Sequence, residues 1–140
     1  FILINALDAA NILAIFPTAS ISHQLPLRAL TDALEDRGHT LTIISTDPER
    51  LGRNHPNTTE IDTHFTYNFF RKNFNFVKFK ESTADELDMM AMWLPVMEQM
   101  YKEQFDHPDV KKLIQSRGNV TFDVVIVEYS MYYPWFALAE

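Results

Sequence analysis

The sequence predicts an α/β fold, a Rossmann-like doubly wound sheet of parallel strands with helices on both faces. Two runs of apolar residues, Asn11 to Phe16 and Phe122 to Val127, lead to this prediction. Short and nearly uninterrupted apolar runs are typical of strands that are buried on both faces, as those of parallel sheets are. An amphipathic segment and a second strand follow the first run, which is the order of a right-handed βαβ unit.

The first βαβ unit is expected to end at Ser45. Pro17 ends the first strand, and a helix is predicted from Gln24 to Arg37. Ser22 is the candidate N-cap, and Gly38 stops the helix as a C′ glycine does. The second strand covers Thr40 to Ser45. The apolar positions that would face the sheet recur at helical spacing, and they are Leu27, Leu30, Ala33 and Leu34.

The sequence patterns that predict the next elements are less regular. A third strand is predicted from Thr58 to Thr63. Phe65 to Phe79 is rich in aromatic residues, and we interpret it as irregular or partly extended. Helical spacing of apolar residues returns from Leu87 to Phe105, where Pro95 is expected to kink the helix or divide it in two. A short helix is predicted from Pro108 to Ile114.

The second long apolar run is the last predicted strand, and the next helix is expected from Tyr129 onward, with Trp135 to Glu140 inside it. In open parallel sheets, binding and catalytic sites form at the carboxyl ends of the strands. His23 follows the first strand and Glu128 follows the last one. Although they are far apart in the sequence, these two side chains could share one edge of the sheet.

The composition excludes several classes of function. With a net charge of −7 and a sequence pI near 5.1, the chain lacks the basic surface of proteins that bind nucleic acids. Because there is no cysteine, disulfides, zinc–thiolate sites and thiol catalysis are excluded. Neither the dinucleotide-binding glycine motif nor the P-loop motif occurs, which disfavours a dinucleotide-dependent oxidoreductase. The 140 residues are long enough for about one domain.

His23 and Glu128 have the residue types and the strand-end positions of a catalytic pair. A histidine whose second ring nitrogen meets a carboxylate can act as an oriented general base. The alternatives are that His23 is a capping or surface residue and that Glu128 is a solvated carboxylate. The residues by themselves leave both interpretations open.

The helix predicted from Leu87 onward carries methionines and a tryptophan on more than one face. Flexible thioethers suit an adaptable apolar pocket, although packing in the core is the ordinary role of such a cluster. Met90, Trp93 and Met97 are the candidate ligand contacts.

The other histidines predict no metal site, since none has the spacing of the zinc-binding HExxH motif. His39 is expected to have a structural role at a helix-to-strand turn. The remaining three are expected in solvated loops, and they are His55, His64 and His107.

Residues 1–10 have the apolar and small-residue pattern of the end of a signal peptide, so residues 11–140 are interpreted as the domain. The sequons at Asn57 and Asn119 are candidate glycosylation sites, as expected for secretory entry. Since no run of about 18 apolar residues occurs, no membrane span is predicted within this segment.

Two long segments carry a resemblance to a known family. NILAIFPTASISHQLPLRALTDALEDRGHTLTIIST resembles the N-terminus of animal UDP-glycosyltransferases, particularly those of insects. FDVVIVEYSMYYPWFALAE resembles a later strand–helix unit of the same domain. The resemblance covers essentially the whole chain and rests on the order of its motifs, each of which is weak alone.

The resemblance implies a glycosyltransferase of the GT-B type, which has two Rossmann-like domains, with this chain as the N-terminal, acceptor-binding half. In that family, the histidine after the first strand deprotonates the acceptor hydroxyl, and an aspartate after the later strand orients it. The matching residues are His23 and Glu128, so the sequence departs from the family by one methylene group. The implied reaction is attack of a small lipophilic acceptor on a UDP-sugar, with inversion.

The resemblance also implies further parts of the enzyme. The UDP-sugar would be bound mainly by a C-terminal domain that is absent from this sequence, and neither a metal nor another cofactor is expected. A membrane anchor would also lie there and hold the enzyme in the endoplasmic reticulum, facing the lumen. The isolated chain is therefore expected to be inactive. The alternative is a non-catalytic α/β domain that binds a small apolar ligand.

Overall fold

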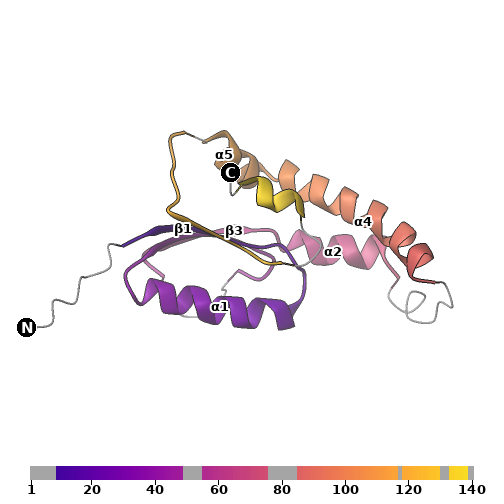
Figure 1. Ribbon diagram of the computed structural model, residues 1–140, viewed down its shortest axis with the longest axis horizontal. Coiled ribbons are helices and arrows are strands. Elements are labelled where there is room, and N and C mark those ends of the chain that lie inside the picture. The colour runs from indigo at the N-terminus through magenta and orange to yellow at the C-terminus, as the bar shows by residue number, and fades with distance from the viewer. Residues whose placement is uncertain (1–8, 49–54, 76–84, 117, 130–132, 139–140) are drawn as a thin grey trace, which may run out of the picture.

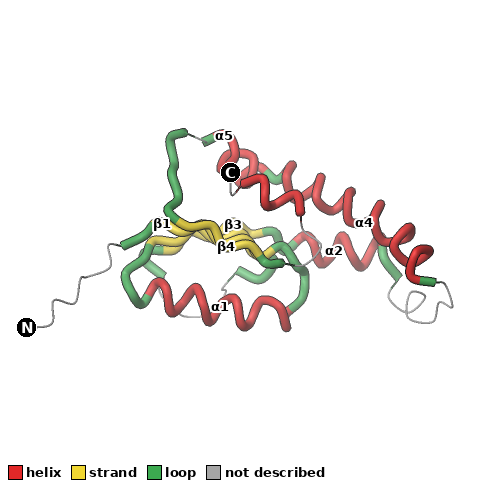
Figure 2. Tube along the Cα trace, viewed as in Figure 1, coloured by secondary structure: helices red, strands yellow, loops and turns green. Residues whose placement is uncertain are grey.

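A four-stranded parallel sheet with the strand order β3-β2-β1-β4 forms the centre of the protein. α1 (Ile21–Glu35) lies on one face of this sheet, and the later helices lie on the other face (Figure 1, Figure 2). The predicted α/β fold class is therefore confirmed. The structure is a computed structural model, and it describes residues 9–48, 55–75, 85–116, 118–129 and 133–138.

The strands agree with the sequence pattern, except that β3 ends at Asp62 instead of Thr63 and that β4 differs as follows. The central strand β1 is buried along nearly its whole length, because it pairs with a neighbour on each side. β4 is shorter than predicted and only half-buried, since it lies at the edge of the described sheet, where Val124 is 45% exposed. The four strands are β1 (Asn11–Phe16), β2 (Thr40–Ser45), β3 (Thr58–Asp62) and β4 (Val124–Val127).

The order of the strands creates a switch point between β1 and β4. From β1 the chain moves outward on one side to β2 and β3, and it then crosses back to place β4 on the other side of β1. Ligands of open α/β sheets bind at the carboxyl ends of strands where the order reverses in this way. The fold therefore predicts a binding site at the carboxyl ends of β1 and β4.

α1 begins earlier than the sequence predicted. Its N-cap position is Ser20 instead of Ser22, and His23 therefore lies in the first helical turn and not in a loop. The two serine hydroxyls lie 3.0 Å apart and contact each other, and the side chain of Ser20 makes no cap hydrogen bond. Because both serines are acceptable cap residues, local sequence does not separate the two possible starts.

The side of α1 that faces the sheet is also more polar than predicted. Gln24, Thr31 and Glu35 are buried, whereas Leu27 is only partly buried and Leu30 is 42% exposed. These polar side chains are buried with hydrogen-bond partners: Gln24 donates to the carbonyl of Phe16 at the end of β1, Glu35 accepts from the N–H group of Asn57, and Thr31 donates to the carbonyl of Arg28 within α1.

The aromatic-rich segment forms a helix, so the prediction of an irregular or extended segment was wrong for the residues that the structure describes. α2 (Phe65–Asn73) buries Phe69 and Phe70, and Phe74 follows at helical spacing. The rings of Phe70 and Phe74 pack against Trp93, with ring centroids 5.8 Å and 4.5 Å away. These tertiary contacts override the strand preference of aromatic residues.

α4 (Glu86–Asp106) is one continuous helix, and Pro95 lies inside it without dividing it. Its start is fixed by Asp85, whose side chain accepts a hydrogen bond of 2.9 Å from the N–H group of Asp88. The inner side of the helix buries Met97, Met100 and Gln104. In Figure 1, α2 and the N-terminal half of α4 extend beyond the sheet.

The remaining elements complete the face of the sheet opposite α1. α5 (Pro108–Gln115) begins at its proline, as predicted. After β4, η1 (Tyr133–Leu138) is a 3₁₀-helix where an α-helix was predicted, and it buries Trp135 completely. Among the described residues, no helix has the length and apolar character that crossing a membrane requires.

Candidate active site

His23 and Glu128 are in direct contact at the switch point. Nδ1 of His23 lies 2.5 Å from Oε1 of Glu128. Because an ionised carboxylate can only accept hydrogen bonds, the ring nitrogen is the donor. This hydrogen bond selects the tautomer in which Nε2 carries a lone pair. The side chain of His23 is 45% exposed and that of Glu128 is 8% exposed, so a buried carboxylate orients an accessible ring.

The backbone at the ends of two strands places these side chains. The N–H group of Glu128 donates to the carbonyl of Ile15 at 3.0 Å, which extends the pairing of β1 and β4 by one residue. On the other side, the N–H group of His23 donates to the carbonyl of Ser20 at 3.0 Å in the first turn of α1. The predicted meeting of His23 and Glu128 at one edge of the sheet is therefore present.

The longer side chain of Glu128 makes a second contact. Its Oε2 accepts a hydrogen bond of 3.3 Å from the backbone N–H group of Thr18, while Oε1 contacts His23. The carboxylate therefore bridges the loop that follows β1 and the helix that begins after this loop. The aspartate of the family pattern is one methylene shorter, so the bridge depends on the glutamate found here. Asp123 lies at the opposite end of β4, where its Oδ2 accepts from the N–H group of Asn11 at 2.7 Å.

The loop between β1 and α1 is held by Gln24, a residue that the sequence analysis missed. Its Nε2 donates to the carbonyls of Phe16 and Thr18, at 3.0 Å and 2.8 Å. Its Oε1 accepts from the hydroxyl of Ser45 at 2.9 Å, and the hydroxyl of Thr46 also donates to Thr18 at 2.8 Å. Gln24 is only 5% exposed, and its position next to His23 was the only signal in the sequence.

Other polar side chains at the same edge are paired with one another. The hydroxyl of Tyr67 donates to Oδ2 of Asp47 at 2.6 Å, and burial together with this carboxylate raises the pKa of Tyr67. Arg28 contacts Glu60 and also donates to the carbonyl of Asp47 at 2.8 Å. Nδ1 of His64 donates to the carbonyl of Thr46 at 2.8 Å. The polar groups beside β2 and β3 therefore have partners within the protein.

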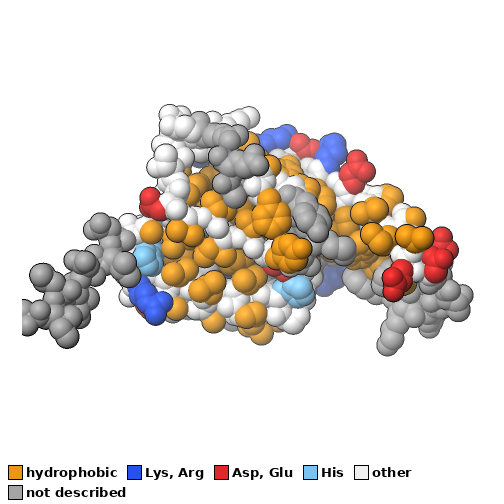
Figure 3. Space-filling view, viewed as in Figure 1, with side chains coloured by type: hydrophobic (Ala, Val, Ile, Leu, Met, Phe, Trp, Pro, Cys, Tyr) orange, Lys and Arg blue, Asp and Glu red, His pale blue; other side chains and the backbone are white. Residues whose placement is uncertain are grey.

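Of the three predicted ligand contacts on α4, two line a common hollow and one lies outside it. A shallow hollow of about 240 Å³ is lined by Trp93, Leu94, Met97, Glu98 and Tyr101. Trp93 and Met97 belong to this lining, whereas Met90 does not and is 54% exposed. In Figure 3, hydrophobic and acidic side chains lie together near the N-terminal end of α4. Trp93 and Met97 thus stay candidate ligand contacts, and Leu94 is an addition.

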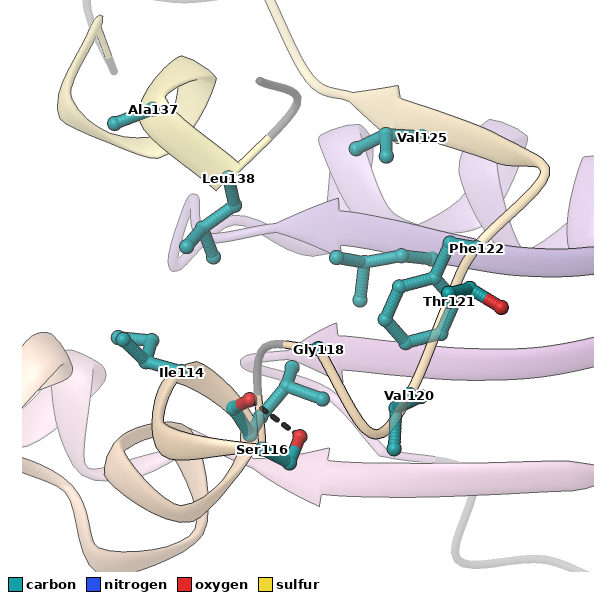
Figure 4. A pocket seen from close by; sticks show the side chains of 11 residues that line it. Ile114, Ser116, Gly118, Val120, Thr121, Phe122, Val125, Ala137 and Leu138 are labelled. Carbon is teal, nitrogen blue, oxygen red and sulfur yellow. Dashed lines mark hydrogen bonds between the residues drawn. The ribbon is translucent and has the colours of Figure 1, made fainter.

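A second cavity, of about 340 Å³, lies on the opposite side of β1 and β4 from α1, near their amino ends. Side chains of α5, β4 and η1 point into it (Figure 4). The described residues that line this cavity include no titratable side chain. Its apolar lining includes Leu13, Ile114, Phe122, Val125 and Leu138.

The other histidines have structural contacts. Nδ1 of His39 accepts from the N–H group of Ala10 at 3.0 Å, which agrees with the predicted structural role. The prediction that His55 is solvated was wrong, because it contacts the buried carboxylate of Glu35 and is 14% exposed. His107 stacks on the ring of Phe65, with centroids 5.7 Å apart. Within the described part of the chain, no three suitable side chains are placed to bind a metal ion.

The predicted glycosylation sites both lie at the surface. Asn57 precedes β3 and is exposed, although its backbone N–H group donates to Oε1 of Glu35 at 3.2 Å. Asn119 is exposed in the turn that follows α5. Residues 1–8 of the predicted signal-peptide segment lie outside the described residues.

Comparison with known proteins gives a consistent group of relatives. The ecdysteroid UDP-glucosyltransferase of Spodoptera littoralis nuclear polyhedrosis virus is 34% identical over 135 residues, which are 90% of this chain and 26% of the viral protein. The protein of the same name from Autographa californica nuclear polyhedrosis virus is 33% identical over 133 residues, or 89% of this chain and 25% of that protein. The one from Lacanobia oleracea granulosis virus is 29% identical over 119 residues, or 85% of this chain and 25% of that protein.

The matched chain spans about a quarter of the length of these curated relatives. No family model matches the chain, and no solved structure matches it with significance.

Proposed function

Because this chain belongs to the UDP-glycosyltransferase family, we propose that it supplies the acceptor site and the general base of an enzyme that transfers a sugar from a UDP-sugar to a hydroxyl group. The acceptor is a small lipophilic molecule, and the transfer inverts the configuration at the anomeric carbon of the sugar. The observation that carries this proposal is the 2.5 Å contact between His23 and Glu128 at the switch point of the sheet. A non-catalytic binding domain has no need of such an oriented and accessible base.

In the proposed reaction, Nε2 of His23 takes the proton of the acceptor hydroxyl as the oxygen attacks the anomeric carbon. The bond between this carbon and the UDP oxygen breaks, and UDP leaves with the electron pair. His23 becomes an imidazolium in this step, and the carboxylate of Glu128 stabilises the new positive charge. General-base assistance of this kind contributes a factor of about 10²–10⁴ in rate. The proton passes from the ring to solvent after the product leaves.

The lipophilic acceptor would contact the hollow on α4. Tyr101, which lines the hollow, is three positions from Gln104 along this helix, and Gln104 donates to the carbonyl of Pro17 just after β1. The hollow therefore begins about 4.5 Å along the helix axis from the carboxyl edge. Apolar side chains with a few polar groups are typical of pockets for small molecules. The names of the relatives specify ecdysteroids and glucose, so an ecdysteroid and UDP-glucose are the first acceptor and donor to test.

The test uses a polypeptide of the length of the relatives that contains this chain. His23→Ala should lower kcat by about 10²–10⁴-fold and leave the Kd of the acceptor within about twofold, because the base acts in the transition state. His39→Ala is the matched control, since His39 lies at the amino edge of the sheet, and it should retain the wild-type kcat. Wild-type turnover by His23→Ala would contradict the proposed role.

The same assay separates the enzyme from a binding domain. If the wild-type polypeptide binds the acceptor but never releases UDP in its presence, the chain is a non-catalytic domain. The chain of 140 residues alone should bind acceptor without turnover, because we assign most of the UDP-sugar site to a C-terminal domain. Robust transfer by this chain alone would contradict that assignment.

A further inference from the structure

Gln104 is a completely buried amide in the last turn of α4. It is 0% exposed, and it lies on the same inner side of the helix as Met97 and Met100, which are apolar. An amide in such surroundings is unfavourable unless its donors and acceptor are satisfied. An apolar side chain of similar length could fill the same space, so the amide calls for an explanation beyond packing.

The amide of Gln104 connects four segments that are distant in the sequence. Its Nε2 donates to the carbonyl of Pro17 at 3.0 Å and to the hydroxyl of Thr66 at 3.1 Å. Its Oε1 accepts from the indole N–H group of Trp135 at 3.2 Å. The hydroxyl of Thr66 in turn donates to the carbonyl of Thr63 at 2.8 Å. One side chain of α4 thereby joins the loop after β1, α2 and η1.

One of these contacts falls in the loop that precedes α1, and another falls on the element that follows Glu128 along the chain. Pro17 directly precedes Thr18, whose N–H group donates to Glu128, and the same loop leads into the first turn of α1 with His23. Trp135 lies in η1, which follows Glu128 along the chain. Gln104 therefore holds the backbone on the His23 side and the segment on the Glu128 side to a common point.

We propose that Gln104 is a positioning residue that sets the geometry of the His23–Glu128 pair through Pro17 and Trp135. Gln24 holds the same loop from the face of the sheet that α1 covers, and Gln104 holds it from the face that α4 covers. The loop is thus fixed from both faces by buried amides, and the ring of His23 keeps one orientation. This inference rests on the proposed function for its kinetic consequence but not for its structural one.

The substitution that tests it is Gln104→Met, which keeps the length of the side chain and removes its hydrogen bonds. The first readout is nitrogen NMR of the His23 ring in the chain of 140 residues. The wild type should show one neutral tautomer, with the proton on Nδ1, and Gln104→Met should show a mixture of both tautomers. In the longer polypeptide, kcat should fall about tenfold to a hundredfold while the KM of the acceptor stays within about twofold, because a small misplacement of the base affects mainly the transition state.

Two further variants keep the test decisive if Gln104→Met fails to fold. Trp135→Phe removes only the N–H group and retains a ring that can stack on Phe105, whose centroid lies 4.4 Å away. It should show the same mixture of tautomers to a smaller degree. Gln99→Met is the matched control, because Gln99 is an exposed glutamine on the same helix that donates to Glu103. It should behave as the wild type.

The two ways of failing are distinguishable. If Gln104→Met or, where that variant does not fold, Trp135→Phe keeps one His23 tautomer and the wild-type kcat, then Gln104 is only a structural residue and the inference is wrong. If the tautomers change but kcat does not change, even in His23→Ala, then the proposed catalytic role of His23 is wrong and the positioning role of Gln104 stands.

Discussion

Glu35 contacts His55 at the amino edge of the sheet and repeats there the kind of pair that His23 and Glu128 form at the carboxyl edge. The two pairs differ in exposure, since the ring of His55 is 14% exposed and that of His23 is 45% exposed. Glu35 also accepts from the N–H group of Asn57 at 3.2 Å. The buried pair ties α1 to the segment before β3, and only the pair at the carboxyl edge leaves its histidine accessible.

The Glu35 pair predicts a loss of stability in acid. Burial by itself would raise the pKa of Glu35, but hydrogen bonds from His55, Thr58 and Asn57 and the charge of His55 lower it below its ordinary value of 4.5. A carboxyl whose pKa is lowered by folding stabilises the protein above pH 4.5 and loses this contribution as the pH falls through the folded-state pKa. Glu35→Gln should therefore lower the free energy of unfolding by about 1.5–3 kcal/mol at pH 7, and the difference should shrink below pH 4.5.

This prediction is checked by urea denaturation of the wild type and the variant at several pH values from about 3 to about 7, an interval that includes the titration of Glu35. Glu103→Gln is the control, because Glu103 is an exposed carboxylate on α4, and this variant should keep nearly the wild-type free energy of unfolding. A difference for Glu35→Gln that is constant over the whole pH range would show that the carboxylate charge plays no part.

The bridge made by Glu128 predicts that its length matters. Glu128→Asp should lower kcat by about tenfold or more, because the shorter side chain cannot reach both His23 and Thr18 from the same backbone position. Glu128→Gln keeps the shape but loses the charge that stabilises the imidazolium, so kcat should fall by about 10²–10⁴-fold.

Steady-state kinetics with saturating donor measure both Glu128 effects, and the KM of the acceptor should hardly change in either variant. Asp123→Asn is the control on the same strand, since its side chain contacts Asn11 at the far end of the sheet. Equal activity of Glu128→Asp and the wild type would mean that the contact with Thr18 is dispensable.

The hollow on α4 predicts which exposed side chains contact the acceptor. Leu94→Ala should raise the KM of a lipophilic acceptor about tenfold, which corresponds to about 1.4 kcal/mol of lost apolar contact. Met92→Ala should leave KM unchanged, because Met92 is similarly exposed on the same helix and does not line the hollow. Since Leu94 is 57% exposed and Met92 is 53% exposed, neither change should alter the melting temperature much. Equal KM values for both variants would place the acceptor elsewhere.

The exposed sequons predict glycosylation if the enzyme faces the lumen of the endoplasmic reticulum, as we propose. Expression in insect cells should give a product whose mass falls after treatment with an N-glycosidase. Asn57→Gln and Asn119→Gln should each remove one glycan, since both side chains lie at the surface. A product without glycans would contradict the proposed location.

Much of this architecture was predictable from local patterns. The apolar runs of β1 and β4 predicted parallel strands, although β4 is only half-buried, and the position of His23 and Glu128 after them predicted one shared edge. Strand periodicity and the rule for parallel sheets depend on neighbouring residues in the chain, so they are visible in the sequence. The identity of the candidate base followed from this reasoning together with the family resemblance.

Only the tertiary structure decided how the pair is held. Gln24 and Gln104 have no distinguishing pattern in the sequence, and their roles depend on partners such as Pro17, which is 87 residues from Gln104. The helical state of α2 was likewise decided by the packing of Phe70 and other rings against α4. A buried hydrogen bond or ring contact is defined by groups that meet only when the chain has folded, whereas the local pattern records only which face of an element is apolar.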